Sequence, residues 1–287
     1  MDADRCPLLI VGGESDPNTC RIVDQAHLRN IDYLFWDTDL EHARQIAWDF
    51  ERPIIDLGDR SIQPEAVYLR FNVFAGEPTV NHAAFELCES FVQAWPSIRW
   101  LNRSSAGDSN NKSRNLRLAQ QIGFVIPNTT VIGDTTPLAS HPDPDATIIK
   151  PLSGGDHAMA VRSIQYAPER LAQLPPQFVQ EKLDGENLRV FSIGGILTAF
   201  HLETNAVDYR TDEAVTVHQV DVPIELRDPI TRFIEQVGFD YCALDFRCRR
   251  GFDEPVFLEV NSFPMFVAFD DASENKLADQ ILGFLVR

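Results

Sequence analysis

Residues 241–264 read YCALDFRCRRGFDEPVFLEVNSFP, and the interpretation of the whole chain starts from this segment. It predicts two strands joined by a polar turn. Asp245 interrupts the apolar run of the first strand, and Glu259 and Asn261 lie two residues apart in the second. Because side chains alternate between the two faces of a strand, Glu259 and Asn261 point to one face. If the two strands pair, Asp245 reaches the same face.

These two carboxylates and one amide oxygen form an all-oxygen cluster, the kind of ligand set that Mg2+ prefers. Mg2+ usually keeps coordination positions for phosphate oxygens, so the cluster predicts a nucleotide-metal site. The alternative is an edge strand with its polar face in solvent. The apolar neighbours Phe257, Leu258 and Val260 favour the metal site, because carboxylates in an apolar segment are costly unless they are paired or metal-bound.

Composition limits the partners and the compartment. The chain has 287 residues, of which 44% are hydrophobic, so it can bury a substantial core. Its formal net charge of -18 argues against binding to nucleic acid or to an anionic membrane. The 5 cysteines are odd in number and no two have CxxC spacing, which indicates reduced thiols. With no signal peptide and no membrane-spanning run, the sequence predicts a cytoplasmic protein.

Strand-like and helix-like patterns alternate over the first hundred residues, which predicts a small α/β unit there. Strands are expected at 8–11, 33–36 and 67–71, and helices after Pro17 and at 41–50 and 83–94. Gly12 and Gly13 offer a cradle for phosphate. They lack the GxGxxG pattern, however, which favours a plain turn at the end of a strand.

A lysine near the end of the expected strand 148–151 is followed by a glycine-rich segment. Lys150 with Ser153, Gly154 and Gly155 offers one ammonium group and several backbone N–H groups, a combination that binds phosphate oxygens. The alternative is a glycine hairpin beside a solvated lysine, and the residues alone do not separate the two. A further strand is expected at 158–164.

Strands expected at 178–183, 187–193 and 197–202 suit an antiparallel sheet. Arg189 lies among apolar residues of the second strand and therefore requires an anionic partner. Arg210 is a second candidate cation. For both arginines a structural ion pair is the alternative, and for His201 on the third strand ordinary sheet packing is favoured.

Three motifs now stand in a particular order: 148–155, then 179–183 with 187–191, then Leu244 and Asp245 with 257–261. This order resembles the ATP-grasp superfamily, and the nearest likeness is to its RimK-like and glutathione-synthetase-like carboxylate-amine ligases. The expected helix at 112–122, which stops at Gly123 before Pro127, is also similar. The likeness is motif-level from residue 102 to 261, and before residue 102 it is only an α/β pattern.

The resemblance implies an ATP-grasp fold that combines α/β and α+β parts. Residues 1–101 would form an N-terminal α/β domain, 102–180 a central lid subdomain, and 181–287 a C-terminal antiparallel-sheet subdomain that carries the metal site. ATP with Mg2+, or Mn2+ in its place, would bind between the last two. Because dimers are common in the superfamily, a homodimer is a further expectation.

The resemblance also implies roles for individual residues. The nucleotide would be bound by Lys112, Lys150, Ser153, Gly154, Gly155, Glu181, Lys182, Leu183 and Glu186. Lys112 and Lys150 would face the phosphates, and Glu186 would face the ribose hydroxyls. The metal would be bound by Asp245, Glu259 and Asn261. Arg189 and Arg210 would face the acyl phosphate and the transferring phosphoryl group.

The identity of the substrates is left open. Residues 207–210 are similar to the Asp-Trp-Arg motif of ligases that cross-link microviridin-type peptides. The sequence departs from that subfamily at 262–266, which stands in place of a Gly-Gln-Trp-like run. Because 287 residues leave little room for a large docking surface, the expected carboxylate and amine substrates are small molecules, amino acids or short peptides. A peptide guided by a leader stays open through the similarity at 207–210.

The expected activity is ATP-dependent ligation of a carboxylate to an amine through an acyl phosphate. Two lysines, two arginines and Mg2+ suit phosphoryl transfer, which depends on positioning and on neutralising charge. Two rival interpretations stay open. One is a nucleotide-binding regulator or scaffold, against which the complete metal set argues. The other is a kinase that stops at phosphoryl transfer.

Overall fold

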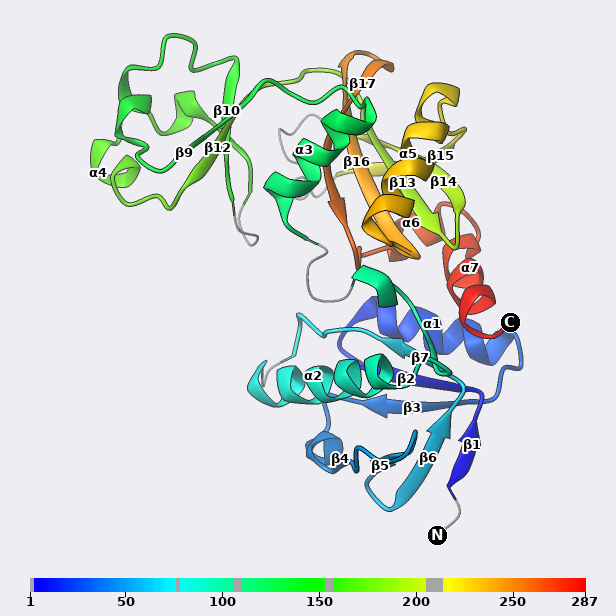
Figure 1. Ribbon diagram of the computed structural model, residues 1–287. Helices are drawn as coiled ribbons and strands as arrows, with labels where there is room; N and C mark the ends of the chain where they lie inside the picture. The colour runs from blue at the N-terminus through cyan, green and yellow to red at the C-terminus, as the bar shows by residue number, and fades with distance from the viewer. Residues whose placement is uncertain (1–2, 76–77, 106–109, 153–156, 205–213) are drawn as a thin grey trace.

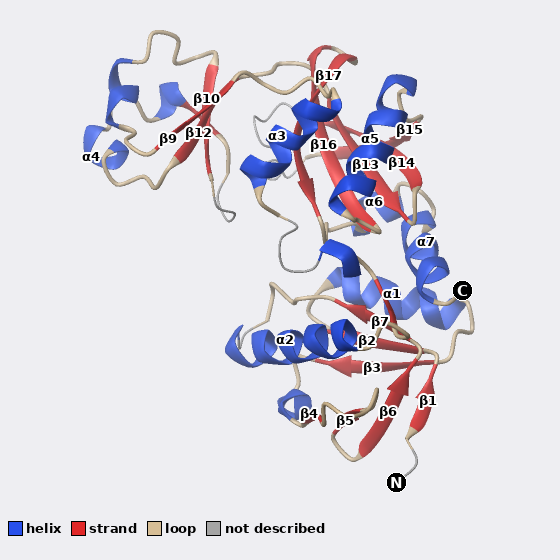
Figure 2. Cartoon of the chain, viewed as in Figure 1, coloured by secondary structure: helices blue, strands red, loops and turns tan. Residues whose placement is uncertain are grey.

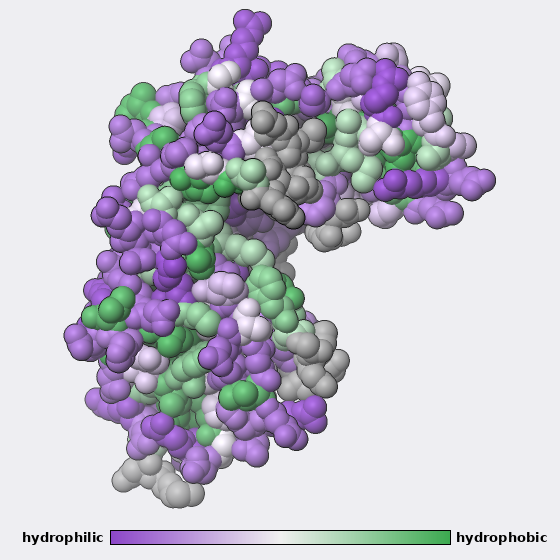
Figure 3. Space-filling view, turned by 180° about the vertical axis from the view of Figure 1, so that it is seen from behind, coloured by the Kyte–Doolittle hydropathy of each residue, from purple (hydrophilic) through white to green (hydrophobic). Residues whose placement is uncertain are grey.

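The computed structural model describes residues 3–75, 78–105, 110–152, 157–204 and 214–287, without the side chains of 78–80. Figure 1 shows an N-terminal α/β layer at one end of the molecule, a five-stranded sheet with its helices beyond it, and a small sheet that projects to one side. Seen from behind, the surface is hollowed below this projecting part and is largely hydrophilic (Figure 3). No helix in the described part of the chain is both long and apolar enough to cross a membrane.

The N-terminal layer contains a parallel sheet in the order β3 (Tyr33–Asp37), β2 (Leu8–Gly12), β7 (Ala66–Leu69) and β8 (Arg99–Trp100). Every residue of β2 is buried, as expected for a central parallel strand covered on both faces. Helix α1 (Pro17–Leu28) packs its buried residues with one set of alternate β2 residues, and α2 (Pro78–Ala94) with the other. The predicted α/β pattern is confirmed for this layer.

The helix predicted at 41–50 is wrong. This segment forms a short 3-10 helix, η1 (Glu41–Arg44), and a strand, β4 (Ile46–Trp48). β4 pairs with β5 (Ile55–Leu57), and a second small sheet continues through β6 (Arg60–Pro64) to β1 (Asp4–Cys6), as Figure 2 shows. Strand pairing and the contact of Trp48 with Phe91 therefore override the helical spacing of the apolar residues.

The predicted strand pair at 241–264 is confirmed as β16 (Tyr241–Arg250) and β17 (Asp253–Asn261). They lie at one edge of an antiparallel sheet that continues through β13 (Asn187–Ile193), β14 (Ile196–Glu203) and β15 (Thr216–Val220). Helices α3 (Lys112–Ile122) and α5 (Ile224–Val237) share a core with one face of this sheet. The other face packs on α6 (Val267–Asp271), α7 (Lys276–Leu285) and the N-terminal layer.

The projecting part of the molecule is a small antiparallel sheet with its own core. Its order is β11 (Met159–Ala160), β10 (Thr147–Pro151), β12 (Gln177–Glu181) and β9 (Thr129–Ile132). The strand predicted at 158–164 is shorter than expected, because after Ala160 the chain turns into the 3-10 helix η4 (Val161–Ser163), which buries Val161. A 3-10 helix, η3 (Thr136–Ser140), and α4 (Pro168–Leu171) complete this part. The predicted domain boundaries stay a prediction.

A cluster of four phenylalanines joins the segment that follows α3 to α5 and to the β16–β17 pair. Phe257 is fully buried, and its ring centroid lies 5.4 Å from Phe124, 5.5 Å from Phe233 and 5.8 Å from Phe246. Aromatic pairs at such separations are favourable beyond the area that they bury. The cluster therefore fixes the back of the sheet whose front carries Asp245 and Glu259.

Phe257→Ala is expected to lower the free energy of unfolding by about 3–5 kcal/mol, because it removes a ring that the surrounding core cannot replace. Urea denaturation measures this loss. The control is Phe74→Ala, whose side chain is 48% exposed, and it should change the free energy by no more than about 0.5 kcal/mol. Equal losses for the two variants would contradict the assignment of Phe257 to the core.

Candidate functional site

Polar side chains occupy half of one face of the five-stranded sheet. Arg189 on β13 pairs in register with Asp245 on β16, which pairs in turn with Glu259 on β17. Asn187 and Arg247 form the neighbouring pair on the same two central strands. Because alternate residues of a strand share a face, the same face continues along β13 and β16. Its second half is apolar and packs on α6 and α7. The face of the sheet that packs on α6 and α7 therefore ends in a polar surface, which is formed by these residues of β13, β16 and β17.

Two carboxylates lie at the centre of this surface, together with two cations. Asp245 is buried, and its Oδ1 lies 3.3 Å from a guanidinium nitrogen of Arg189. The Arg189 guanidinium also lies over the rings of two phenylalanines, at 5.4 and 5.1 Å. Lys112 Nζ lies 3.2 Å from Glu259 Oε2. Each carboxylate thus has a cation beside it, which offsets the loss of hydration on burial.

The position of Lys112 follows from local sequence. Asn111 caps helix α3, because its side chain accepts a hydrogen bond from the Arg114 N–H, so Lys112 is the first helical residue. The helix packs against β17. This packing places Lys112 beside Glu259. The predicted roles of Lys112 at the phosphates and of Glu259 at the metal stay predictions.

The chemistry of the donor set fits Mg2+ or Mn2+. Asp245 and Glu259 are register partners on neighbouring strands, and Asn261 donates from Nδ2 to Asp245 Oδ2 at 3.1 Å, so its amide group lies beside Asp245. The same amide carries an oxygen, which is a further hard ligand type. In the described residues no three His, Cys, Asp or Glu side chains form a metal cage. Two carboxylates and one amide suit an ion that also takes phosphate oxygens, rather than one held by protein alone.

A cavity lies between this surface and the small projecting sheet. It encloses about 810 Å³ of empty space, part of which is open to solvent. Six of the residues that the sequence singled out line this one cavity, namely Lys150, Glu181, Lys182, Leu183, Asp245 and Glu259.

The segment that links the small sheet to the five-stranded sheet is held by ion pairs. Glu181, the last residue of β12, accepts two hydrogen bonds of 2.8 Å from Arg249 and one of 2.9 Å from the Asn128 N–H. The hydrogen bonds from Arg249 lower the pKa of the Glu181 carboxyl. Lys182 pairs with Asp184 at 3.0 Å. These contacts fix the direction of the chain along the edge of the cavity.

Glu186, which the resemblance assigns to the ribose, contacts a histidine. The distance between Glu186 Oε2 and His201 Nε2 is 2.7 Å. His201 also packs against the ring of Phe252, at 4.7 Å between ring centroids. His201 therefore combines sheet packing with a polar contact to Glu186, and the role of Glu186 stays a prediction.

Several predicted site residues lie outside the described part of the chain. They are Ser153, Gly154, Gly155 and Arg210, and nothing in the structure bears on them.

Arg247 is a cationic residue of the cavity that the sequence reasoning missed. It lines the cavity, and its Nε donates to the Gly185 carbonyl at 3.1 Å. Burial lowers the pKa of its guanidinium. A signal was present in the sequence, because Arg247 follows Asp245 by two residues and so belongs to the same face of the strand. Gly185 has to be glycine for this approach, since a Cβ there would clash with the Cys248 carbonyl.

The chain was compared with known proteins. No protein-family model matches it. A probable alpha-L-glutamate ligase of Hydrogenovibrio crunogenus is 26% identical over 202 residues, which cover 64% of this chain and 66% of that relative. The chain thus spans just under two thirds of the length of this curated relative.

Solved structures of similar shape cover nearly the whole chain. A RiPP-associated ATP-grasp ligase of Chryseobacterium gregarium, in complex with ADP and a leader and core peptide, has a TM-score of 0.78 at 17% identity, over 98% of this chain and 96% of that chain. The macrocyclase MdnC of Microcystis aeruginosa MRC, bound with its precursor peptide MdnA, has a TM-score of 0.75 at 18% identity, over 98% and 99%. D-alanine–D-alanine ligase of Bacillus anthracis, complexed with ATP, has a TM-score of 0.58 at 14% identity, over 100% and 98%. The chain therefore has the ATP-grasp fold, as the order of its motifs predicted.

Proposed function

We propose that this protein is an ATP-dependent carboxylate-amine ligase that forms an amide bond through an acyl phosphate. One observation carries the proposal. Residues of three separate motifs line a single cavity, with Lys150 on one side and the facing carboxylates Asp245 and Glu259 on the other. Cations on one wall and an oxygen cluster on another suit a triphosphate with a bound metal.

Each part of the nucleotide has a proposed partner. Lys150 and Lys112 bind phosphate oxygens, and Asp245, Glu259 and Asn261 hold Mg2+ or Mn2+. The segment from Glu181 to Leu183 binds the base, and Glu186 the ribose. Ser153, Gly154 and Gly155, which lie outside the described residues, are assigned to the phosphates by the resemblance alone. When bound, the metal neutralises charge on the phosphate oxygens and orients the transferring group.

The proposed reaction has two steps. A carboxylate oxygen of the acid attacks the γ-phosphorus of ATP, the bond from that phosphorus to ADP breaks, and an acyl phosphate forms. The amine nitrogen then attacks the acyl carbon, the carbon–oxygen bond to phosphate breaks, and the nitrogen loses a proton. Arg189 lies beside Asp245, where its positive charge stabilises the transferring phosphoryl group. Arg210 is proposed to stabilise the oxyanion of the second step.

We propose that the acid and the amine belong to amino acids or peptides. The support is the name of the glutamate-ligase relative and the precursor peptides in complexes of structurally similar proteins. A cytoplasmic location and a homodimer are further parts of the proposal. All five cysteines are free thiols in the structure, which is consistent with a reducing compartment.

Two other functions would use the same site. A regulator would bind ATP without turnover, and a kinase would release a stable phosphorylated product. Analysis of the products distinguishes them, because the ligase alone yields ADP, phosphate and an amide.

Nucleotide binding is tested by a thermal melt with ATP, with and without Mg2+. At a hundredfold excess over Kd, binding to the folded state stabilises the protein by about 2.7 kcal/mol, so wild type should melt at a higher temperature only when both are present. Glu259→Gln should lose this increase, because it removes a metal-binding carboxylate. A wild-type melt that ATP and Mg2+ leave unchanged would contradict the proposed function.

The matched control is Asp253→Asn. It makes the same change of charge at an exposed residue of the same strand, and should retain the full increase. The two variants are then compared for ADP release in mixtures of candidate acids and amines. Wild-type turnover by Glu259→Gln would overturn the metal assignment.

Arg247→Met is expected to weaken ATP binding about tenfold or more, because one hydrogen bond to a charged group contributes about 1.5–3 kcal/mol. Arg247 lines the cavity without contributing to the oxygen cluster. Isothermal titration calorimetry with ATP at saturating Mg2+ measures the change. The control is Arg250→Met, which changes an exposed arginine three residues further along the same strand and should bind ATP as wild type does. If Arg247→Met also binds ATP as wild type does, the assignment of Arg247 to the ATP site is wrong.

A further inference from the structure

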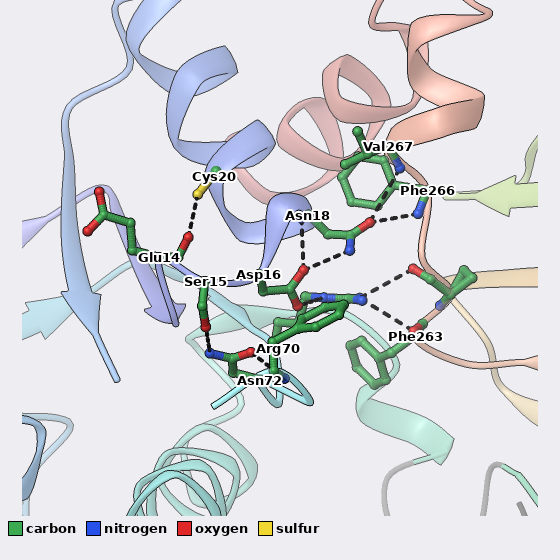
Figure 4. Close-up of polar contacts among 12 residues, drawn as sticks. Glu14, Ser15, Asp16, Asn18, Cys20, Arg70, Asn72, Phe263, Phe266 and Val267 are labelled. Carbon is green, nitrogen blue, oxygen red and sulfur yellow. Dashed lines mark hydrogen bonds and ion pairs between the residues drawn. The ribbon is translucent and has the colours of Figure 1, made fainter. Parts of the chain in front are cut away.

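A buried ion pair lies where the N-terminal layer meets the turn that follows the proposed metal ligand Asn261. Arg70 follows β7, and Asp16 precedes α1 and caps it. Asp16 is 0% exposed and Arg70 is 5% exposed, and Arg70 Nε lies 2.6 Å from Asp16 Oδ2. Figure 4 shows the pair facing the backbone of residues near Phe263.

The second end of the Arg70 guanidinium binds the turn itself. Its Nη1 donates to the Pro264 carbonyl at 3.2 Å and to the Phe263 carbonyl at 3.4 Å. One planar side chain therefore connects a carboxylate of the N-terminal layer with two carbonyls that lie about 190 residues further along the chain. A lysine has a single nitrogen and cannot make both sets of contacts in this fork geometry.

Asn18 extends the network to the other end of the turn. Its N–H and its Nδ2 both donate to Asp16 Oδ1, at 2.8 and 2.7 Å. Its own Oδ1 accepts from the Phe266 N–H at 2.7 Å and from the Val267 N–H at 3.3 Å (Figure 4). The orientation of Asn18, and with it the start of α6, thus depends on Asp16.

Asn102, which follows β8, and Tyr241, the first residue of β16, also hold this turn. Asn102 Nδ2 donates to the carbonyls of Tyr241 and Ser262, at 2.7 Å each. The Tyr241 hydroxyl donates to the Pro264 carbonyl at 3.1 Å. The turn is therefore clamped between the first residue of β16 and Arg70, directly after Asn261 ends β17.

Stability alone does not account for a buried charge pair here. Taking two charges out of water is costly, and apolar residues of similar volume are often as stable. What the pair supplies is a set of directed donors for two carbonyls of the turn, those of Phe263 and Pro264, and the second of these also accepts from the Tyr241 hydroxyl. Because the turn follows β17 directly, fixing its backbone also fixes Asn261, the last residue of that strand.

We infer that Arg70, oriented by Asp16, is a positioning residue for the metal site: it holds the turn after Asn261 so that the Asn261 amide stays beside Asp245. This inference rests on the proposed function, because it assigns a distant support to the proposed metal ligands. Partners bonded directly to a metal ligand typically change metal affinity by about 10–100-fold when they are lost. Arg70 acts one step further out, through the turn, so an effect at the lower end of this range is expected.

The test uses Arg70→Lys in the full-length protein and measures the Mg2+ concentration that gives half of the ATP-dependent rise in melting temperature. Arg70→Lys keeps the positive charge beside Asp16 but loses the fork to the turn, and it should raise this concentration about tenfold or more. If Arg70→Lys does not fold, the double variant Arg70→Met/Asp16→Asn, which leaves no unpaired buried charge, carries the same measurement.

The matched control is Arg21→Lys. Arg21 also joins α1 to the C-terminal segment, through Asp270 at 2.8 Å and Asp271 at 2.6 Å, but it is not bonded to the turn. Arg21→Lys should lower the melting temperature, but its Mg2+ requirement should stay within twofold of that of wild type. An unchanged requirement in the Arg70 variant, or an equal rise in the Arg21 variant, overturns the inference.

The proposed function fails separately. If wild type shows no Mg2+-dependent effect of ATP at all, the metal site itself is wrong, and with it the positioning role. If wild type responds and the Arg70 variants respond identically, only the positioning role is wrong.

Discussion

The structure depends on the balance of charge where Asp245 and Glu259 face each other across β16 and β17. Two carboxylates on one half-buried face repel each other and lose hydration, so each must be compensated. Arg189 compensates Asp245 from the neighbouring strand, and Lys112 compensates Glu259 from a helix. The same arrangement suits a divalent cation accompanied by an anionic ligand, since the ion offsets part of the phosphate charge and Lys150 and Arg247 line the same cavity.

This constraint explains how the rest of the chain is arranged. One face of the five-stranded sheet is divided, with a polar half at the cavity and an apolar half that packs on α6, α7 and the N-terminal layer. The opposite face rests on α3 and α5 around Phe257. The sheet is thereby fixed on its apolar parts, and its polar half remains available to a ligand. The small sheet brings Lys150 and the segment after Glu181 to the other side of the same cavity.

Much of this was predictable from sequence because strand alternation is a local property. It placed Glu259 and Asn261 on one face, and the order of the motifs indicated the fold. The same rule would have found Arg247, which follows Asp245 by two residues. The helix expected at 41–50 failed because pairing of β4 with β5 decided that segment. The Arg70–Asp16 pair was beyond sequence reasoning, since it joins residues 54 positions apart to a turn near the end of the chain.

The most direct test of the account is the paramagnetic effect of Mn2+ on side-chain amide NMR signals in the presence of ATP. If Asp245, Glu259 and Asn261 bind the metal, the amide signals of Asn261 should broaden at substoichiometric Mn2+. Those of Asn30, in the exposed turn after α1, should not. Selective broadening of Asn261 that requires ATP is the predicted result. Uniform broadening, or an unchanged Asn261, would contradict a nucleotide-metal site on this sheet.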